Sequence, residues 1–261
     1  MKIQFYKYHG TGNDFIMIDD RLNKLSFSVE EVKLLCDRHF GIGGDGLIRI
    51  VKKDGFDFEM VYYNSDGNLG SMCGNGGRCA VAFAHFLKII KEETNFLAFD
   101  GPHEAIVLSD TPMNVKLKMA DVLNLHKVKG AIILNTGSPH YVTFVKSVKD
   151  LDVVKKGKVI RNSPPYKSEG INVNFVEIED HFIHVRTYER GVEDETLSCG
   201  TGVTAAVLAA VFSGKLKNKD ECVVYTPGGK LKVHFSKEGH GFEQIWLEGP
   251  AVAAFSGSVP K

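Results

Sequence analysis

The chain has 261 residues, 32 of them basic and 32 acidic, so its formal net charge is zero with neutral histidine. This balance argues against nucleic acid or an anionic membrane as a partner, because both usually select a basic excess. The start of the sequence alternates polar and apolar residues and lacks the apolar block of a signal peptide, and the longest apolar run, 203–212, is too short to span a bilayer. We therefore expect a cytoplasmic protein that acts on a small molecule, with no membrane and no nucleic acid.

The first third of the chain predicts strands with one early helix. Residues 2–8 alternate like a strand, and a capping box at Ser28 and Glu31 opens a helix that runs to about His39. The turn 41–46 contains G-x-G-x-x-G, but it follows a helix and precedes a β-like segment, which is the reverse of a dinucleotide-binding turn. We read it as a tight helix-to-strand connection.

Short strands dominate the remainder, and two alanine-rich helices are expected among them, at about 76–91 and 201–212. A Pro-Gly-Gly turn at 227–229 joins two strands as a hairpin. The expected strands after the glycine turn are 47–51, 56–63, 115–119, 132–134, 141–145, 172–178, 182–188, 221–226, 230–235 and 244–247.

Two segments read almost alike, Cys73-Gly74-Asn75-Gly76 and Cys199-Gly200-Thr201-Gly202, and each runs into one of the alanine-rich helices. A helix N-terminus carries unpaired N–H groups and a positive dipole end, which favour a thiolate and bind carboxylates. Two such helix starts that share a site would form a two-thiol acid/base pair around an amino acid. For either cysteine alone, a small buried hydrophobic role is the alternative. The repetition and the flanking glycines favour a functional role for both cysteines.

The repetition extends beyond the cysteines. Gly12 and Gly137 lie 125 positions apart, as do Asn64 and Glu189, while Cys73 and Cys199 lie 126 apart. A fourth match, between the turn 41–46 and Gly170, is loose. We expect an α+β protein of two pseudo-symmetric α/β halves, each with strands wrapped around a central helix and with the two cysteines at the shared interface. Residues 1–120 form the N-terminal half, completed in one interpretation by 250–261, and residues 121–249 form the C-terminal half.

The other three cysteines lack such a context. Cys36 and Cys222 fall in apolar segments typical of core, and Cys79 has no paired Cys-x-x-Cys or His-x-x-x-His partner, so no metal site is expected. An odd count of scattered cysteines also argues against a disulfide framework, and free thiols are expected.

Polar residues next to glycines or strand ends complete the candidate site: Asn13, Asn64, Ser138, His140, Asn172, Glu189 and Arg190. Turn chemistry is the alternative for the asparagines, and a surface ion pair is the alternative for Glu189 and Arg190. An adjacent carboxylate and guanidinium at a strand end would suit an ammonium and a carboxylate of a substrate.

These motifs together, from His9-Gly10-Thr11-Gly12-Asn13-Asp14-Phe15 to Cys199-Gly200-Thr201-Gly202, resemble the diaminopimelate epimerase family over nearly the whole chain. The resemblance implies a homodimeric, cofactor-free isomerase that converts LL-2,6-diaminopimelate to the meso form, in lysine and peptidoglycan precursor biosynthesis. It implies Cys73 and Cys199 as the catalytic acid/base pair, with His140 and Glu189 tuning the thiols. The substrate-binding residues it implies are Asn13, Asn64, Gly74, Asn75, Ser138, Asn172, Glu189, Arg190, Gly200 and Thr201.

Two positions depart from the family pattern. Ser138 stands where many members have Asn before the Pro-His pair, and Gly46 stands where many have Gln after Asp45. Serine cannot present an amide, so a substrate contact there would be lost or bridged by water. Two other functions stay open: a proline racemase-like or other cofactor-independent amino-acid isomerase, and a non-catalytic amino-acid-binding protein with structural thiols.

Overall fold

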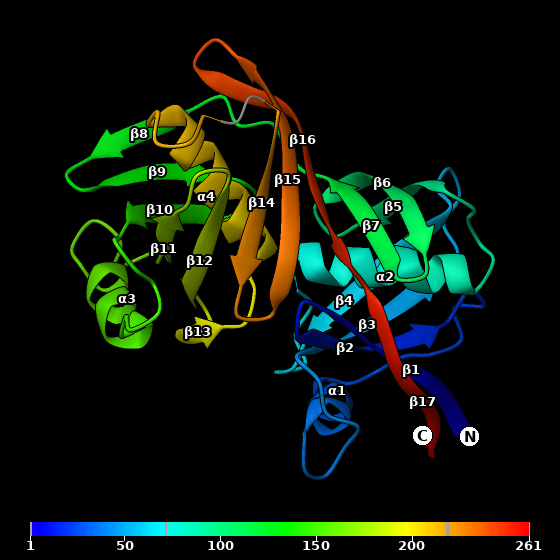
Figure 1. Cartoon of the computed structure of the whole chain (residues 1–261). Helices are drawn as coiled ribbons and strands as arrows, with labels where there is room; N and C mark the ends of the chain where they lie inside the picture. Colours follow the sequence, from blue (N-terminus) through cyan, green and yellow to red (C-terminus); the bar gives the residue numbers. More distant parts are fainter. Residues whose placement is uncertain (1, 71, 218–219, 261) are drawn as a thin grey trace. The chain divides into compact units, whose positions relative to one another are not determined.

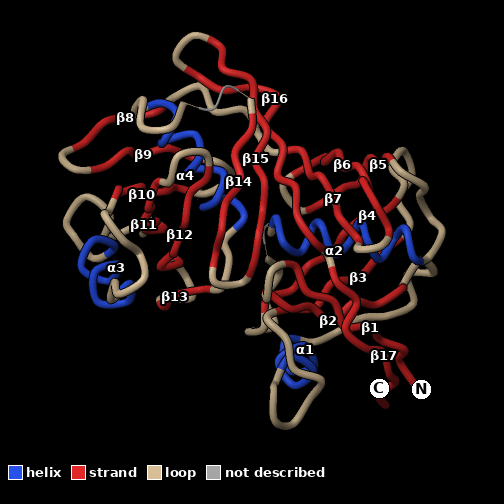
Figure 2. The backbone as a smooth tube through the Cα atoms, viewed as in Figure 1, coloured by secondary structure: helices blue, strands red, loops and turns tan. Residues whose placement is uncertain are grey.

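A computed structural model describes residues 2–70, 72–217 and 220–260 (Figure 1). The chain divides into two compact units, Met1–Leu117 with Gly249–Lys261, and Lys118–Glu248. We call them the first and the second unit. Each unit has one long helix that packs against several strands of the same unit, and strands outnumber helices throughout (Figure 2).

In the first unit, the terminal strands β1 and β17 pair antiparallel, so the two chain ends lie side by side (Figure 1). β2 runs parallel to β3, and β3 pairs antiparallel with β4. The central helix α2 packs against β1, β2, β3, β4 and β6. The elements are β1 (Lys2–Gly10), β2 (Asn13–Asp19), α1 (Val29–Cys36), β3 (Gly46–Val51), β4 (Phe58–Asn64), α2 (Gly74–Phe86), β5 (Glu93–Ala98), β6 (Gly101–Asp110), β7 (Met113–Lys118) and β17 (Val252–Pro260).

The second unit repeats this plan. β10 runs parallel to β11, β11 pairs antiparallel with β12, and the central helix α4 packs against β9, β10, β11, β12, β14 and β15. The elements are β8 (Leu125–Val128), β9 (Ala131–Asn135), β10 (Pro139–Phe144), α3 (Val153–Arg161), β11 (Asn172–Ile178), β12 (Phe182–Glu189), β13 (Asp194–Thr196), α4 (Gly200–Phe212), β14 (Glu221–Thr226), β15 (Gly229–Glu238) and β16 (Gly241–Pro250).

Both central helices are buried along nearly their whole length, from Gly74 to Ala84 in α2 and over most of Gly200 to Val211 in α4. Small residues allow this, because alanine and glycine let strands approach the helix from several sides. A helix that is apolar all round is stable only when it is enclosed. The alanine-rich runs of the sequence therefore position the helix starts, and with them the cysteines, inside each unit.

Strand register defines which residues of the two units are equivalent. Phe15 pairs with Gly46 and His140 pairs with Asn172, so the fourth landmark of the repeat joins Gly46 to Asn172 and sets Gly170 against Gly44 of the turn 41–46. One strand further, Ile48 pairs with Tyr62 and Asn174 pairs with Thr187. Phe15, Ile48 and Tyr62 in the first unit thus occupy the same positions as His140, Asn174 and Thr187 in the second.

Several sequence expectations differ from the structure at element boundaries. The first helix ends at Cys36 and not near His39, because the Asp37 carboxylate accepts from the backbone N–H groups of His39 and Phe40 and turns the chain. The first alanine-rich helix, α2, ends at Phe86 rather than near Lys91, since Lys88 adopts a positive φ of 59°. Strands β2, β5, β6, β8, β13 and β17 and helix α3 were not predicted. The helix-to-strand turn at 41–46 and the hairpin of β14 and β15 are confirmed.

No helix formed by the described residues has the length and apolar character needed to cross a membrane.

Candidate active site

Each predicted catalytic cysteine is the N-cap residue of a central helix. Cys73 precedes α2 with φ −108° and ψ 122°, and Cys199 precedes α4 with φ −116° and ψ 111°. The carbonyl groups of both accept the first helical hydrogen bonds, at 2.7 Å from Gly77 N and 2.8 Å from Val203 N. The two helix starts are therefore near copies of one local structure, in which a thiol lies beside backbone N–H groups that have no intrahelical partner.

Two predicted residues of the first unit lie at Cys73. The Cys73 thiol donates to Asn13 Oδ1 across 3.5 Å, and Asn75 Nδ2 donates to the same oxygen at 3.3 Å. Asn13 begins β2, and Asn75 is the second residue of α2. The structure thus joins the glycine turn of β1–β2 to the cysteine motif, as the sequence predicts.

A network of charges holds the Asn13 amide. Asn13 Nδ2 donates to Asp45 Oδ2 at 2.7 Å, and Arg38 bridges Asp45 and Asp14 with N–O distances of 2.7 Å to each. The Lys7 ammonium lies 2.7 Å from Asp14 on the other side. Burial by itself would raise the pKa of Asp14, but the hydrogen bonds from Arg38 and Lys7 outweigh it and hold that pKa well below the usual range. Asp14 is therefore ionised, and the network is set for one amide orientation.

Arg78, one turn into α2, is buried completely. Its guanidinium donates to Gly74 O at 3.3 Å and to Asn75 Oδ1 at 2.9 Å. Burial lowers the pKa of Arg78 to about 10, while the neighbouring thiols of Cys79 and Cys73 oppose that shift. A Cβ at Gly10 would lie 3.1 Å from Arg78 Nη2, so that glycine leaves room for the guanidinium.

The equivalent of Arg78 in α4 is Thr204, which is also buried and whose hydroxyl donates to Gly200 O at 3.0 Å. Both side chains thus bind the carbonyl of the first helical residue. The repeat preserves this contact with a cation in one unit and a neutral hydroxyl in the other.

In the second unit, Cys199 lies next to the hydroxyl of Thr201, with 3.5 Å between Cys199 Sγ and Thr201 Oγ1. Ser138 Oγ lies 3.1 Å from Thr201 Oγ1 and 2.9 Å from His140 Nε2, and it accepts from Asn172 Nδ2 at 3.0 Å. Four predicted residues are therefore connected to the cysteine through hydrogen bonds.

His140 is completely buried on β10. Burial, and to a smaller extent the positive charge of Arg190, lowers the pKa of His140 to about 3, so the ring is neutral near pH 7. Asn174 Nδ2 lies 3.0 Å from His140 Nδ1, and Thr187 donates to Asn174 Oδ1 at 2.9 Å. A Cβ at Gly202 would lie 2.4 Å from Asn174 Oδ1, so this motif glycine admits the asparagine amide.

Glu189 ends β12, Arg190 follows it in the next turn, and the two have different partners. Thr196 Oγ1 donates to Glu189 Oε2 at 2.9 Å, whereas Arg190 donates through its backbone N to Asn172 Oδ1 at 2.8 Å and through Nη1 to Glu169 O at 3.0 Å. A Cβ at Gly170 would lie 2.7 Å from Arg190 Cδ, so Gly170 gives the arginine side chain its room.

Asn64 ends β4 at the same sheet edge as Gly46, with which it pairs. Its backbone closes the turn 64–68, and its Oδ1 would lie 3.0 Å from a Cβ at Gly70. A Cβ at Gly46 would lie 2.5 Å from both the Tyr62 ring and Tyr63 O. The space of a side chain at position 46 is therefore filled by Tyr62, whose ring also contacts Phe15 edge-on at 5.9 Å.

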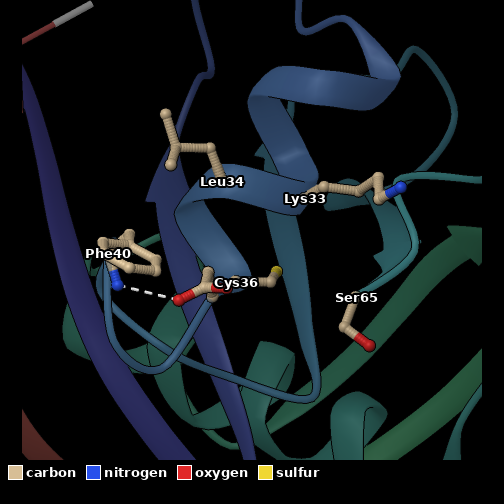
Figure 3. Close-up of a pocket in the computed structure, with 6 residues that line it drawn as sticks. Lys33, Leu34, Cys36, Phe40 and Ser65 are labelled. Carbon is tan, nitrogen blue, oxygen red and sulfur yellow. Dashed lines mark hydrogen bonds between the residues drawn. The ribbon is translucent and has the colours of Figure 1, made fainter.

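The three remaining cysteines are buried. Desolvation raises the pKa of Cys36 to about 11 and those of Cys79 and Cys222 to about 12, so these thiols stay protonated. A cavity of about 440 Å³ lies beside α1 (Figure 3), and none of its lining residues was predicted for the site. The lining residues are Lys33, Leu34, Cys36, Asp37, Phe40 and Ser65.

No group of three or more His, Cys, Asp or Glu side chains within the described ranges is arranged to hold a metal ion.

Sequence reasoning missed the residues that support the site. Asp45, Arg78, Asn174 and Thr187 orient side chains next to the cysteines, yet only Asp45 and Arg78 lie in the motifs themselves. The signal for Asn174 was an asparagine at a buried position of a strand, two residues after Asn172. A buried polar side chain in an apolar strand needs a hydrogen-bond partner. For Asn174 that partner is His140, one of the candidate site residues.

Solved structures with this fold include a phenazine biosynthesis protein of the PhzF family from Bacillus anthracis, with a TM-score of 0.78, 14% identity and full coverage of both chains. A probable proline racemase from Agrobacterium radiobacter matches with a TM-score of 0.70 and 15% identity over 99% of this chain and 93% of that one. At these identities the likeness concerns the fold alone. It confirms the α+β class expected from the sequence and places the chain among proteins that share the fold of these two structures.

Sequence comparison is more specific. The diaminopimelate epimerase family profile matches residues 5–123 and 132–253. Diaminopimelate epimerase of Flavobacterium psychrophilum is 47% identical over 98% of this chain and 100% of its own length, and that of Chlorobaculum tepidum is 40% identical over 96% and 98%. The chain belongs to the diaminopimelate epimerase family. This confirms the family predicted from the motifs and the isomerase class of the enzyme.

Proposed function

We propose that this chain interconverts LL-2,6-diaminopimelate and meso-diaminopimelate without a cofactor, with Cys73 and Cys199 as the acid/base pair. The observation that carries the proposal is the repeated helix start, in which each cysteine is the N-cap of a buried helix. Inversion of an α-carbon needs one group to remove a proton from one face and another to deliver a proton to the opposite face. Two equivalent thiols from two repeats supply such a pair.

In the proposed reaction a thiolate removes the α-proton while the other cysteine, as a thiol, donates a proton to the opposite face. The reverse reaction exchanges these roles. Negative charge that develops on the substrate carboxylate is stabilised by the N–H groups of Gly74 and Asn75 and of Gly200 and Thr201. No ring system is needed to delocalise it.

We assign the rest of the substrate to the polar residues around the two helix starts. Asn13, Asn64 and Asn75 in the first unit, and Ser138, Asn172, Glu189 and Arg190 in the second, supply amide, hydroxyl, carboxylate and guanidinium groups. An exposed guanidinium suits the distant carboxylate of a two-headed amino acid, and a carboxylate suits its ammonium. His140 and Glu189 tune the thiols. In this proposal the enzyme is a cytoplasmic homodimer, acts in lysine and peptidoglycan precursor biosynthesis, and comprises the two halves 1–120 with 250–261 and 121–249.

The decisive experiment is solvent exchange. Protein freed of metal and pyridoxal phosphate is incubated with LL-diaminopimelate in deuterated water, and the product is analysed for configuration and label. We expect meso-diaminopimelate with deuterium at the inverted α-carbon. Activity that requires added pyridoxal phosphate would contradict the proposal.

Two variants test the pair directly. Cys73→Ala and Cys199→Ala should each nearly abolish epimerisation and leave the far-UV circular dichroism unchanged. Cys36→Ala serves as the matched control, because that thiol is buried and lies outside the motifs. Turnover close to wild type in either active-site variant would exclude the two-thiol mechanism.

The same assay separates the alternatives. Racemisation of proline or epimerisation of hydroxyproline in preference to diaminopimelate would favour a proline racemase-like enzyme. Tight binding of diaminopimelate without exchange of its α-hydrogen would favour a non-catalytic binding protein.

A further inference from the structure

A continuous chain of hydrogen bonds in the second unit ends at Cys199. It runs from Asn174 through His140, Ser138 and Thr201 to the sulfur, with heavy-atom distances of 3.0, 2.9, 3.1 and 3.5 Å. The direction of each hydrogen bond decides whether the Cys199 sulfur accepts a hydrogen bond or donates one. That direction follows from counting donors and acceptors along the chain.

Backbone groups orient the two asparagines. Asn172 Oδ1 accepts from Arg190 N at 2.8 Å, so its amide nitrogen is the group that faces Ser138. Asn174 Nδ2 lies 3.4 Å from the carbonyl oxygen of Tyr141, which can only accept, so its nitrogen is the group that faces His140 Nδ1. Both amides therefore donate to members of this series of hydrogen bonds, Asn172 to Ser138 and Asn174 to His140.

The His140 ring is neutral at pH 7, since burial lowers its pKa to about 3. Its Nδ1 accepts from Asn174, so its single proton lies on Nε2 and is donated to Ser138 Oγ. Ser138 Oγ also accepts from Asn172 Nδ2. Both lone pairs of the serine oxygen are then occupied, and its one proton points to Thr201 Oγ1. The Thr201 proton is left to donate to Cys199 Sγ.

The first unit has no such chain at the equivalent positions. Phe15, Ile48 and Tyr62 replace His140, Asn174 and Thr187, and the equivalent of Ser138 is Asn13, which turns an accepting oxygen to Cys73. The repeat preserves the helix start but reverses the polarity of the group beside the sulfur. A difference of this kind points to a particular role for the polar chain at Cys199.

We propose that Ser138 is a positioning residue that orders the Thr201 hydroxyl, so that it donates to the Cys199 sulfur and stabilises the thiolate. The inference rests on the proposed function, in which Cys199 acts as a base in one direction of the reaction. The serine at this position is then a working substitute for the usual asparagine, whose amide can likewise accept from His140 and donate to Thr201.

His140 is a titratable group linked to this sulfur through the hydrogen bonds above. Glu189 ends β12 and Arg190 follows it, where Arg190 N donates to Asn172. The readout below therefore compares variants that leave all of these groups in place.

The experiment measures alkylation of Cys199 by iodoacetamide as a function of pH, with peptide mapping by mass spectrometry. In Ser138→Ala we expect the pH midpoint for Cys199 to rise by about one unit, a roughly tenfold loss of rate at neutral pH, since a lost hydrogen bond to a charged group has that size. The Cys73 midpoint in the same samples should stay unchanged. Ser138→Asn should restore the Cys199 midpoint, and Ser147→Ala, an exposed serine of the same unit, should not shift it.

Thr201→Val provides the second variant. It removes the last donor and should shift the Cys199 midpoint as Ser138→Ala does, and the double variant should shift it no further. An unchanged midpoint in both variants overturns the inference. So does a Ser138→Ala variant with a raised KM for diaminopimelate and an unmoved midpoint, because Ser138 would then be a substrate ligand alone.

Alkylation requires no turnover, so the two proposals fail separately. A midpoint shift in the variants, together with a wild-type protein that exchanges no α-hydrogen, supports the role of Ser138 and contradicts the proposed function. Full epimerase activity of the wild type with no midpoint shift in the variants contradicts the role of Ser138 alone.

Discussion

Asn13 donates its amide N–H to Asp45 Oδ2 across 2.7 Å, and this bond decides that the oxygen of the same amide faces Cys73. Asp45→Asn should loosen that orientation, because a charged acceptor becomes a neutral amide that can present either end. We expect kcat/KM for diaminopimelate to fall roughly tenfold, the size of one charge-assisted hydrogen bond. Steady-state kinetics test this, with Asp19→Asn, a partly exposed carboxylate of the same unit, as the control. Unchanged kinetics in Asp45→Asn would show that the Asn13 orientation is set by other contacts.

His140 should make stability depend on pH. Its folded pKa of about 3 lies below the ordinary 6.5, so below pH 6.5 the unfolded chain binds a proton that the folded chain does not. The contribution is fully present above pH 6.5 and is lost as pH falls toward 3, at about 1.4 kcal/mol per pH unit, or about 2 kcal/mol at pH 5. Urea unfolding at pH 7.5, 6 and 5 should show this loss in the wild type and not in His140→Gln. Exposed His126→Gln should behave like the wild type. Parallel curves for wild type and His140→Gln would refute the expectation.

Gly76 and Gly202 occupy the same position in the two central helices but face different neighbours. A Cβ at Gly202 would lie 2.4 Å from Asn174 Oδ1, whereas one at Gly76 would lie 3.2 Å or more from side-chain methyl and ring carbons. Alanine gains up to about 1 kcal/mol of helix propensity at either site. We expect Gly76→Ala to be near neutral and Gly202→Ala to cost about 1–3 kcal/mol from overpacking. Thermal and urea unfolding compare the pair, and equal effects would contradict the contact argument.

The Tyr62 ring occupies the space that a side chain at position 46 would need. A side chain at position 46 would meet the Tyr62 ring and Tyr63 O at 2.5 Å, so Gly46→Ala should destabilise the protein by about 1–3 kcal/mol. Tyr62→Thr opens part of that space, and in combination with Gly46→Ala it should show a favourable coupling of at least about 0.5 kcal/mol in a double-mutant cycle. Tyr225→Thr, in the second unit, should show no coupling with Gly46→Ala. Additivity of the first pair would mean that the backbone oxygen alone excludes a side chain.

Replacement of Arg78 should lower activity without lowering stability. Within the described part of the chain no carboxylate forms an ion pair with this fully buried guanidinium, which binds Gly74 O and Asn75 Oδ1 instead. Apolar replacements of buried charges are often neutral or stabilising, by about 1–4 kcal/mol. Arg78→Met should therefore leave the free energy of unfolding unchanged or higher while kcat/KM falls at least tenfold, since Asn75 loses its anchor. Loss of both together would indicate a structural role.

The motifs and their spacing were sufficient to predict the repeat, the two central helices with a cysteine at the start of each, and the family. This follows from local physics, because glycines after a cysteine and an alanine-rich run specify a buried helix start without reference to the rest of the chain. Asn13, Asn75, Ser138 and Thr201 were predictable for the same reason, since they lie within or beside those motifs.

Tertiary structure alone decided how the two half-sites differ. Strand pairing puts Phe15, Ile48 and Tyr62 in one unit where His140, Asn174 and Thr187 lie in the other, and no motif records that correspondence. The direction of a hydrogen bond depends on partners from distant strands, such as Arg190 N for Asn172 and Asp45 for Asn13. The sequence by itself determined which chemistry the chain carries, and the fold determined which way each polar group points, because that orientation is set by contacts between residues far apart along the chain.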